Sequence, residues 1–359
     1  MKACLIERYS SGDMQLDNIG GLHFDNVDTA PSPTAGEIQV KMLGTSINPI
    51  DQLVVTGYGA PLFNPKSKFP IILGRDGVGK VLSIGAGVKG FEVGQRVIIA
   101  ASPRFPGTYA EIVNLPLACV APIPDGLSGE LAAGIGYAGL TAWQSLAAVG
   151  ITEATANKRE IIINGASGGV GSIAVVMATA WGAKVTGTAS RKNHEWLMQL
   201  GCDNVVDYSN SADMNRLDAD LVVNLASPRG DHHVRDPLLP ELLQRPSKEK
   251  GKAYATTVMP LLEKITDNGL VLGIVGGFSG LLKSRLSCAL HGTRYSWVIF
   301  KENQERLRLL AEFFAQPSIA SVVSESHSID ALPKAFNAGE ANTSKGKQVY
   351  MWGAGIETN

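Results

Sequence analysis

The stretch with the clearest chemical meaning is Ile161 to Gly171, with the sequence IIINGASGGVG. A run of β-branched residues precedes a cluster of glycines, which predicts a buried strand that leads into a tight turn. In such a turn backbone N–H groups can approach a pyrophosphate closely, and the N-terminus of the following helix faces the anion. The candidate cofactor contacts in this turn are Gly165, Ser167, Gly168, Gly169, Val170 and Gly171.

The elements around this turn decide whether it binds a nucleotide. After the glycines, apolar residues recur at helical spacing as far as Gly182, a residue typical of a helix C-terminus. A second strand, over 183–189, follows at once. Strand, helix and strand within about 30 residues form the βαβ unit in which a glycine turn binds a dinucleotide. An ordinary strand-to-helix turn is the alternative, and the complete unit argues against it.

The end of the second strand indicates which nicotinamide nucleotide is bound. An NAD-binding strand of this kind usually ends in Asp or Glu, which accepts hydrogen bonds from the ribose. Here the chain reads TGTASRK from Thr186, without an acid. Gly187 leaves room for the ribose, and Ser190, Arg191 and Lys192 can bind a 2′-phosphate. We therefore expect NADPH, unless Arg191 and Lys192 are only solvated charges that open the next helix.

The composition is that of an ordinary globular protein. The chain has 359 residues, of which 45% are hydrophobic and 18% are charged, so two domains are expected and disorder is not. The net charge of −1 provides no basic field for nucleic acid or for an anionic membrane. We expect a small electrophilic molecule as the partner, and neither nucleic acid nor a membrane.

The N-terminus and the cysteines bear on the cellular compartment. The segment MKACLIERYSSG has no apolar run long enough for a signal peptide, and every apolar stretch of about 18 residues has a globular explanation. We therefore expect a cytoplasmic protein. The cysteines, Cys4, Cys119, Cys202 and Cys288, are far apart and form no CxxC pair, so neither a zinc clip nor a disulfide framework is expected.

Two kinds of pattern divide the chain. As far as Pro124, short Val/Ile runs alternate with Gly and Pro, as in a compact β domain. From Ser128 onward, alanine-rich helical patterns lead into the βαβ unit. A charged, proline-containing stretch, 228–252, is interpreted as a surface insertion. Beyond it the sequence predicts a helix over 253–266, a strand GLVLGIVGG from Gly269, a strand over 288–300 and a helix over 302–316.

A series of motifs resembles the medium-chain dehydrogenase/reductase superfamily, on its zinc-free quinone oxidoreductase and enoyl reductase side. The motifs, spread over nearly the whole chain, are SINPIDQLVVTG from Ser46, PIILGRDGVGKV from Pro70, VGQRV from Val93, GTYAEIV from Gly107, GLTAW from Gly139, NGASGGVG from Asn164, LGCDNVVDY from Leu200 and KGKQVYMW from Lys345. The resemblance implies an α/β protein with a GroES-like β-rich catalytic domain (1–128 and 301–359). It also implies a Rossmann domain with a doubly wound parallel sheet (129–300) and a cofactor in the cleft between the domains.

The chain departs from the zinc-dependent members of this superfamily at the metal ligands. Where those enzymes have a cysteine and a Gly-His-Glu motif, this chain has Asn48 and Gly74-Arg75-Asp76. Asn is a poor zinc ligand and Arg is none, so no metal is expected. The strand near Val223 also ends in Asn224-Leu225-Ala226 in place of the usual acid and glycine.

Without zinc, the charge that develops on a substrate oxygen needs hydrogen-bond donors. Asn48 is the first candidate, for a carbonyl or a ribose hydroxyl, and a cap or Asx turn before Pro49 is the alternative. Tyr58 resembles the tyrosine of enoyl reductases, shifted by one residue, and a packed loop tyrosine is the alternative. Asp51 completes the predicted catalytic group, as a residue that orients and caps rather than one that transfers protons.

Four further positions complete the predicted cofactor site. Thr141 resembles the threonine that lies beside the nicotinamide in this family, and a helix-interior threonine is the alternative. Gly276 and Gly277 would let the backbone approach the nicotinamide ring, unless they form a plain strand-end turn. Tyr208 ends the family-like DNVVDY segment and would pack near the adenine.

Together these residues predict a zinc-independent, NADPH-dependent oxidoreductase. It would transfer hydride to a quinone or to the activated double bond of an α,β-unsaturated carbonyl compound. The alternatives are an enoyl-thioester reductase and a nucleotide-binding protein without significant turnover. No tyrosine has a lysine four positions on, and the turn lacks Gly-Lys-Ser/Thr, which argues against a short-chain dehydrogenase and a Walker loop. We expect a homodimer that pairs through the strand near Arg294 to Val298.

Overall fold

The computed structural model describes residues 1–10, 21–66, 68–214, 217–226, 239, 251–258, 261–338 and 345–353. The chain divides into two units, Met1–Leu140 with Lys301–Asn359, and Thr141–Phe300. The first boundary falls inside helix α3 (Gly129–Ala148), whereas the sequence places it before that helix. Most of the 228–252 stretch, interpreted as an insertion, lies outside the described residues.

The first unit contains a small sheet and a large one. The small sheet has the order β2–β1–β4, and the large one has the order β15–β16–β3–β5–β6–β8, with β7 paired to β3. Strand β16 pairs antiparallel with β3, with Val349 opposite Ser46, so both parts of the chain build this sheet. The strands are β1 (Lys2–Ile6), β2 (His23–Asn26), β3 (Glu37–Ser46), β4 (Ile71–Ile72), β5 (Asp76–Ile84), β6 (Arg96–Ala100), β7 (Ile112–Pro116), β8 (Val120–Pro122), β15 (Val323–Ser328) and β16 (Lys347–Met351).

The helices of the first unit pack through short apolar faces. Helix α9 (Gln304–Phe314) buries residues at helical spacing, among them Leu307, Leu310 and Phe314. A Cβ on Gly139 would lie 2.4 Å from Leu310 Cδ2, so this glycine lets α9 approach α3 closely. The remaining helices are α1 (Pro49–Val55), α2 (Ala60–Phe63) and α10 (Leu332–Asn337), with 3₁₀ turns at Leu117–Cys119 and Ile329–Ala331.

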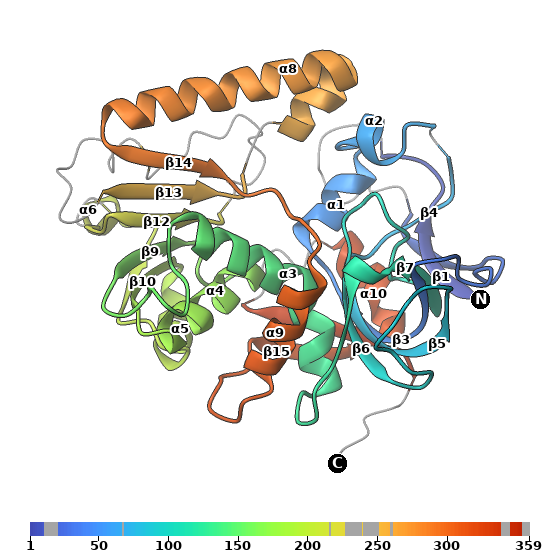
Figure 1. The fold of residues 1–359 in the computed structure, drawn as a ribbon. Coiled ribbons are helices and arrows are strands. Elements are labelled where there is room, and N and C mark those ends of the chain that lie inside the picture. The colour runs from blue at the N-terminus through green and yellow to red at the C-terminus, as the bar shows by residue number, and fades with distance from the viewer. Residues whose placement is uncertain are drawn as a thin grey trace. The chain divides into compact units, whose positions relative to one another are not determined.

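The second unit is a parallel sheet of six strands in the order β11–β10–β9–β12–β13–β14 (Figure 1). The order reverses on either side of β9, which is the arrangement of a dinucleotide-binding Rossmann sheet. Ile161 pairs with Val185 on one side and with Leu221 on the other, so the β-branched run is central and buried, as predicted. The elements are β9 (Glu160–Asn164), α4 (Gly169–Ala180), β10 (Lys184–Ala189), a 3₁₀ turn (Arg191–Asn193), α5 (His194–Gln199), β11 (Asn204–Asp207), α6 (Ser211–Met214), β12 (Leu221–Asn224), β13 (Lys252–Thr256), α8 (Leu261–Leu290) and β14 (Thr293–Trp297).

The segment before β14 differs from the prediction. Residues 252–256, expected to begin a helix, form β13, and the GLVLGIVGG stretch, expected to be a strand, lies in α8. At Gly269 the φ angle is 76°, so the helix breaks there and 261–268 folds back on the longer part. A Cβ on Gly273 would lie 2.3 Å from Ile265 Cα, and one on Gly277 would lie 2.4 Å from Leu261 Cδ1. The glycines therefore serve the close packing of two helical segments.

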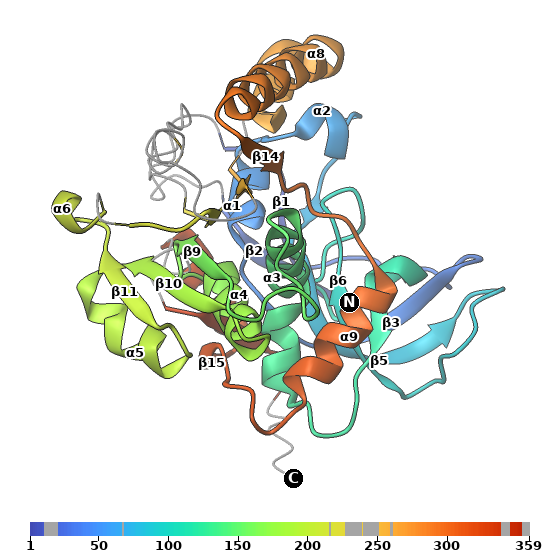
Figure 2. The ribbon, with the colours of Figure 1, turned by 60° about the vertical axis from the view of Figure 1, so that its left-hand side comes forward.

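Helix α8 lies along the outer side of the edge strand β14 in both ribbon views (Figures 1 and 2). Among the described residues, one helical stretch, Glu263–Leu290, is long enough and apolar enough to cross a membrane, judged by length and composition alone. Of its most apolar 18 residues, 22% are buried. One such helix is weak evidence for a membrane span, because core helices of globular proteins pass the same test.

Candidate active site

The glycine turn joins β9 to α4 at the carboxyl edge of the parallel sheet. Gly165 has a φ of 79°, which an L-residue with a side chain rarely adopts. A Cβ on Gly171 would lie 2.1 Å from the carbonyl oxygen of Gly165, so this glycine brings the helix onto the turn. By contrast, a Cβ on Gly168 would have only the carbonyl oxygen of Gly165 within 4 Å. The turn thus leaves a space in front of the N-terminus of α4, as a pyrophosphate requires.

A buried polar network at the ends of three neighbouring strands holds this turn. Asn164 Oδ1 accepts a hydrogen bond from the Thr188 hydroxyl at 2.5 Å, and Asn164 Nδ2 donates to Asn224 Oδ1 at 2.8 Å. The Gly165 N–H donates to Thr188 Oγ1 at 3.2 Å. Since all three side chains are at most 5% exposed, the network fixes the turn at low dielectric. From the sequence, Asn224 is only a departure from the family pattern, because its contact with Asn164 joins residues that are 60 positions apart.

The residues predicted to select the cofactor follow the next strand at the same edge. Ser190 precedes the 3₁₀ turn and accepts a hydrogen bond from Asn193 Nδ2 at 3.4 Å. Arg191 and Lys192 are both exposed. Gly187 does not leave room for a ribose, because a Cβ there would lie 2.9 Å from Ala166 Cβ and point into the packed interior.

A hollow of about 730 Å³ lies over the outermost strand, β11, and is lined by Arg191, His194 and Asp207 among other residues. None of the turn glycines lines it. Tyr208 follows β11 directly and is 60% exposed. The hollow therefore adjoins the predicted 2′-phosphate contacts and is separate from the pyrophosphate turn.

Three predicted cofactor contacts outside the glycine turn also lie in helices. Gly276 and Gly277 are inside α8 and not at a strand end, so the alternative of a strand-end turn is wrong, and their approach to the nicotinamide stays a prediction. Gly276 instead accepts a hydrogen bond from Lys264 Nζ through its carbonyl oxygen, at 3.0 Å. Thr141 is buried in α3, where its carbonyl oxygen accepts a hydrogen bond from Ser145. Its place beside the nicotinamide stays a prediction.

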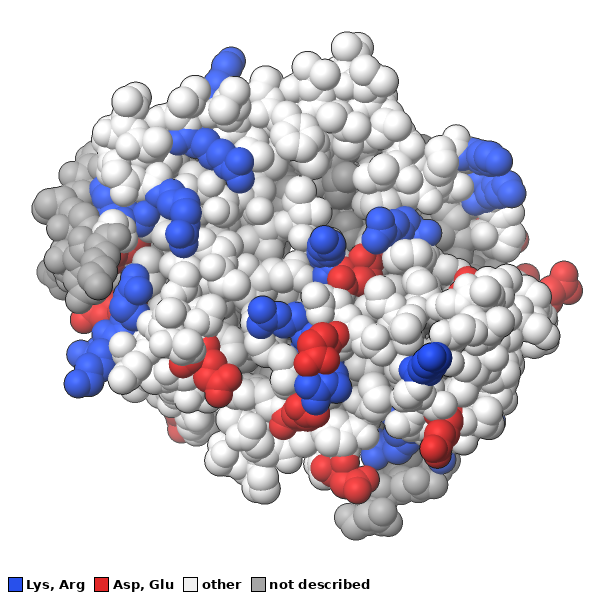
Figure 3. Space-filling model, viewed as in Figure 1, with Lys and Arg blue, Asp and Glu red and all other residues white. Residues whose placement is uncertain are grey.

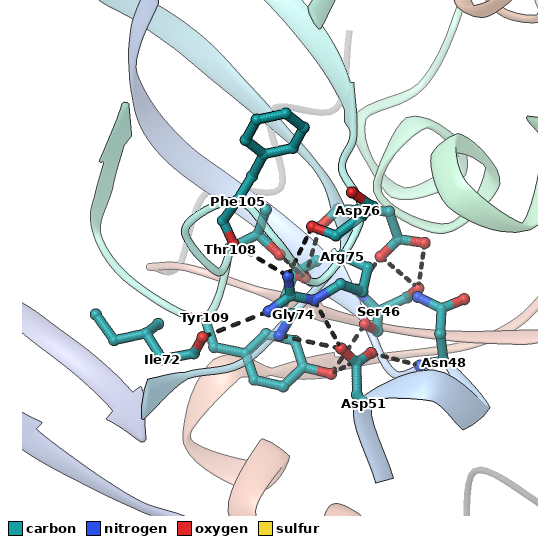
Figure 4. Close-up of polar contacts among 12 residues, drawn as sticks. Ser46, Asn48, Asp51, Ile72, Gly74, Arg75, Asp76, Phe105, Thr108 and Tyr109 are labelled. Atoms are coloured by element: carbon teal, nitrogen blue, oxygen red, sulfur yellow. Dashed lines mark hydrogen bonds and ion pairs between the residues drawn. The ribbon is translucent and has the colours of Figure 1, made fainter. Parts of the chain in front are cut away.

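In the first unit a buried polar cluster surrounds Asp51, in the first turn of α1 (Figure 4). The Asp51 carboxylate accepts hydrogen bonds from the N–H groups of Asn48 and Gly74, at 2.9 and 3.1 Å, and from the Tyr109 phenol at 3.2 Å. Asp51 has no exposed surface. This is the geometry of a residue that caps a helix and orients its neighbours. A catalytic role for Asp51 stays a prediction.

Arg75 is the cation beside this carboxylate. Its Nε lies 3.3 Å from Asp51 Oδ1, and its Nη1 donates to the carbonyl oxygens of Ser102 and Phe105 at 3.1 and 3.2 Å. The side chain is 2% exposed. A guanidinium remains protonated in proteins and offers only donors, so the position holds a fixed positive charge.

Lys347, on β16, is the second buried cation of the cluster. Its Nζ donates to Asn48 Oδ1 at 2.9 Å and to the carbonyl oxygen of Ile47 at 3.3 Å, and it lies 3.8 Å from Asp76 Oδ2. Because an ammonium has no acceptor, the Asn48 atom that faces it is the amide oxygen, and the amide nitrogen points away. This Nδ2 helps to keep Asp76 charged, yet it meets no acceptor of the described residues in hydrogen-bond geometry.

Burial shifts the pKa of Asp51, Asp76 and Lys347. It raises the pKa of Asp51, against the opposing charge of Arg75. It raises the pKa of Asp76 to about 6, although Lys347 acts against it. Burial also lowers the pKa of Lys347, with Asp76 acting in the opposite direction.

Tyr58 lies in the turn between α1 and α2, where its N–H donates to the carbonyl oxygen of Leu53 at 3.3 Å. It is half-buried, and its role as a proton donor stays a prediction. Among the described residues, a separate group of possible metal ligands, Glu7, His23 and Asp25, has its ligand atoms within 4.8 Å of one another. Exposed acidic groups of this kind are common without an ion.

Comparison with known proteins identifies the family. The model of the alcohol dehydrogenase GroES-like domain matches residues 34–125. The mitochondrial NAD(P)H oxidoreductase RTN4IP1 of Drosophila melanogaster is 30% identical over 88% of this chain and 79% of its own. The chain belongs to the medium-chain dehydrogenase/reductase superfamily. It is an oxidoreductase whose relatives imply a nicotinamide cofactor, and the expected GroES-like and Rossmann domains are confirmed.

Two quinone oxidoreductases are also similar to this chain. The chloroplast envelope quinone oxidoreductase homolog of Arabidopsis thaliana is 37% identical over 50% of the chain and 54% of its own length. The solved quinone oxidoreductase from Coxiella burnetii has a TM-score of 0.75, covers 98% of this chain and 99% of its own, and is 21% identical. At that identity the likeness concerns the fold alone.

The expected cytoplasmic location is wrong by this comparison. The Drosophila relative is a mitochondrial protein, and so are the vertebrate proteins of the same name. The expectation depended on the lack of an apolar signal run. Mitochondrial targeting segments are amphipathic and not apolar, so that test has no bearing on this compartment.

Proposed function

We propose that this protein is a zinc-independent, NADPH-dependent reductase of quinones or of α,β-unsaturated carbonyl compounds, and that it acts in mitochondria, as its RTN4IP1 relatives do. The observation that carries the proposal is the orientation of Asn48. Lys347 binds its amide oxygen, and its Nδ2 is a buried donor that acts on the Asp76 carboxylate but meets no acceptor among the described residues in full hydrogen-bond geometry. An unsatisfied buried donor costs about 1–3 kcal/mol, so it calls for an explanation such as a ligand or a catalytic role.

The residues at the sheet edge fit a nicotinamide nucleotide. The space at Gly168 and the N-terminus of α4 would hold the pyrophosphate. Ser190, Arg191 and Lys192 would hold a 2′-phosphate, and no acid ends β10 to bind the free ribose hydroxyls of NADH. When bound, the reduced cofactor supplies the hydride.

Asn48 Nδ2 would donate to the carbonyl oxygen of the substrate, on which negative charge develops as the hydride arrives. Lys347 supports this role in two ways. It fixes the amide so that the oxygen faces the ammonium and the nitrogen points away from it, and it places a buried positive charge beside the amide. Buried charges act more strongly than exposed ones because little water screens them.

The same cluster supports the independence from zinc. Arg75 and Asn48 occupy the positions at which zinc-dependent members have a histidine and a cysteine. The Arg75 guanidinium, 3.3 Å from Asp51, is held on its other side by backbone carbonyl oxygens. Because the Arg75 guanidinium is a fixed cation beside the Asp51 carboxylate, it disfavours the binding of a divalent cation at the same carboxylate.

The test is NADPH oxidation by the purified protein, measured in the presence of a metal chelator against short-chain quinones, small enones, enoyl thioesters and saturated aldehydes. The proposal predicts turnover with quinones or enones and little with aldehydes. Turnover only with enoyl thioesters would favour the thioester reductase. No turnover with any acceptor, together with tight NADPH binding, would assign a binding function without catalysis.

A further inference from the structure

The outward face of α8 is an apolar stripe. In the longer part of the helix the large apolar residues recur at intervals of three or four positions, so they lie on one side of it. These stripe residues are between 57% and 72% exposed: Val271, Val275, Phe278, Leu282 and Leu286. Leu290, at the end of the helix, is 86% exposed. Contiguous exposed apolar surface of this kind marks a site of interaction.

The opposite face of α8 is committed to the fold. Ile265, Leu281 and Cys288 are between 1% and 8% exposed, and the 261–268 segment packs on Gly273 and Gly277. Strands β13 and β14, on either side of α8, pair in parallel from Lys252 and Thr293 to Thr256 and Trp297. Because the strands before and after α8 belong to one sheet, both ends of the helix lie on the same globular unit. The helix therefore lies along the surface of this unit and does not span a bilayer.

The charges on the longer part of α8, after Gly269, have one sign. Lys283 and Arg285 are exposed, and at about 100° per residue they lie about 100° and about 60° from the centre of the stripe, on opposite sides. The chain has no acidic residue between Asn268 and Lys301. In Figure 3 the surface over α8, at the top of the view, carries blue atoms and no red ones.

We propose that α8 attaches the protein to the surface of an anionic lipid bilayer, with the stripe in the boundary between headgroups and acyl chains and with Lys283 and Arg285 on the lipid phosphates. A helix that combines an exposed apolar face with flanking cations lies in the membrane interface in this way. The proposal replaces the expectation, from net charge alone, that no membrane is involved. A net charge of −1 averages over the chain and hides a local cationic face.

A second copy of the chain suits this face less well. Two copies that meet through the stripe would bring together Lys283 and Arg285 of both chains, and the longer part of α8 provides no acid to pair with them; like charges in a contact are unfavourable. An anionic lipid surface supplies the opposite charge for both flanking residues.

The experiment is flotation of the full-length protein with vesicles of phosphatidylcholine alone and of phosphatidylcholine with phosphatidylglycerol. Two double variants change the face: Val275→Ser with Leu282→Ser, and Lys283→Gln with Arg285→Gln. The matched controls are Val93→Ser, which is 69% exposed in the unsubstituted protein, and Lys89→Gln, also exposed. Thermal midpoints and NADPH turnover with a water-soluble acceptor check that every variant folds and functions.

The unsubstituted protein and both controls should float with the phosphatidylglycerol vesicles, and more weakly with phosphatidylcholine alone. The serine variant should lose at least about tenfold in binding to both vesicles, because buried apolar area drives the attachment. The glutamine variant should lose the preference for the anionic vesicles. Failure of the unsubstituted protein to float at low salt would overturn the proposal. So would flotation of the serine variant at the unsubstituted level. If the serine variant instead halves the mass in solution and no form floats, the face binds a second copy.

Discussion

Replacement of Asn48 by alanine separates a catalytic donor from a helix cap. The change removes two contacts: the Nδ2 donor proposed for the substrate oxygen and the Oδ1 acceptor of Lys347 at 2.9 Å. Loss of one oxyanion donor typically costs about 3 kcal/mol, which lowers kcat/KM about a hundredfold. Loss of the acceptor for a buried ammonium should lower the free energy of unfolding by about 1.5–3 kcal/mol.

The matched control is Asn114→Ala, in the same unit. Asn114 Nδ2 donates to the carbonyl oxygen of Pro31 at 2.8 Å, so its loss should cost stability and leave turnover within about twofold. Tyr58→Phe should lower turnover by less than Asn48→Ala, because water can replace a proton donor that is not essential.

The assay is steady-state NADPH oxidation with an enone, together with urea unfolding and NADPH affinity. The proposal predicts that Asn48→Ala remains folded, binds NADPH within about threefold of the unsubstituted protein and loses turnover. If the folded variant keeps its turnover, Asn48 serves as a cap and as the acceptor of Lys347, and the donor hypothesis is wrong.

Four further predictions concern the cofactor, the metal, the pH dependence and the assembly. Titration should show NADPH bound at least about tenfold more tightly than NADH, or about 1.4 kcal/mol, and Arg191→Ala should remove most of this preference without weakening NADH binding; equal affinities in the unsubstituted protein would refute it. Elemental analysis should find far less than one zinc per chain, with full activity in chelator. The pKa of the Asp76 carboxyl rises from 3.8 to about 6 on folding. Between these two pH values the folded chain keeps a proton on Asp76 that the unfolded chain has lost, so the contribution of Asp76 to stability falls as the pH rises. Between about pH 4.5 and 7 the urea midpoint of Asp76→Asn should therefore rise relative to that of the unsubstituted protein; an unchanged difference would contradict the shifted pKa. Light scattering at micromolar concentration should give the mass of a dimer, because β14 is an edge strand of its sheet, and a monomer mass would count against this.

The parts of the fold that the sequence predicts well depend on local patterns. The βαβ unit around Gly165 is such a part, because β-branched residues, glycines and a helical period follow one another within one short stretch. The sequence predicts a strand for the GLVLGIVGG stretch, but glycines and apolar residues without a clear period are compatible with a strand and with a helix. What makes it a helix is the close packing of 261–268 on Gly273 and Gly277, which a local pattern does not contain.

The candidate site shows the same limit. Asn48 and Asp51 could be singled out because they flank Pro49 at a helix start. Lys347 could not, because it is 299 positions from Asn48 in the chain and meets it only when β16 pairs with β3. From the sequence alone, Lys347 would be expected on the surface, since buried lysines are rare.

The central claim is that the protein delivers hydride to a carbon–carbon double bond without the help of a metal. The most direct test uses NADPH that carries deuterium at C4 of the nicotinamide on the transferred face, a small enone and protein dialysed against chelator. The account predicts that deuterium appears on the β-carbon of the saturated product. Deuterium on the carbonyl carbon, which marks reduction to an alcohol, or a reaction that requires added zinc would contradict it.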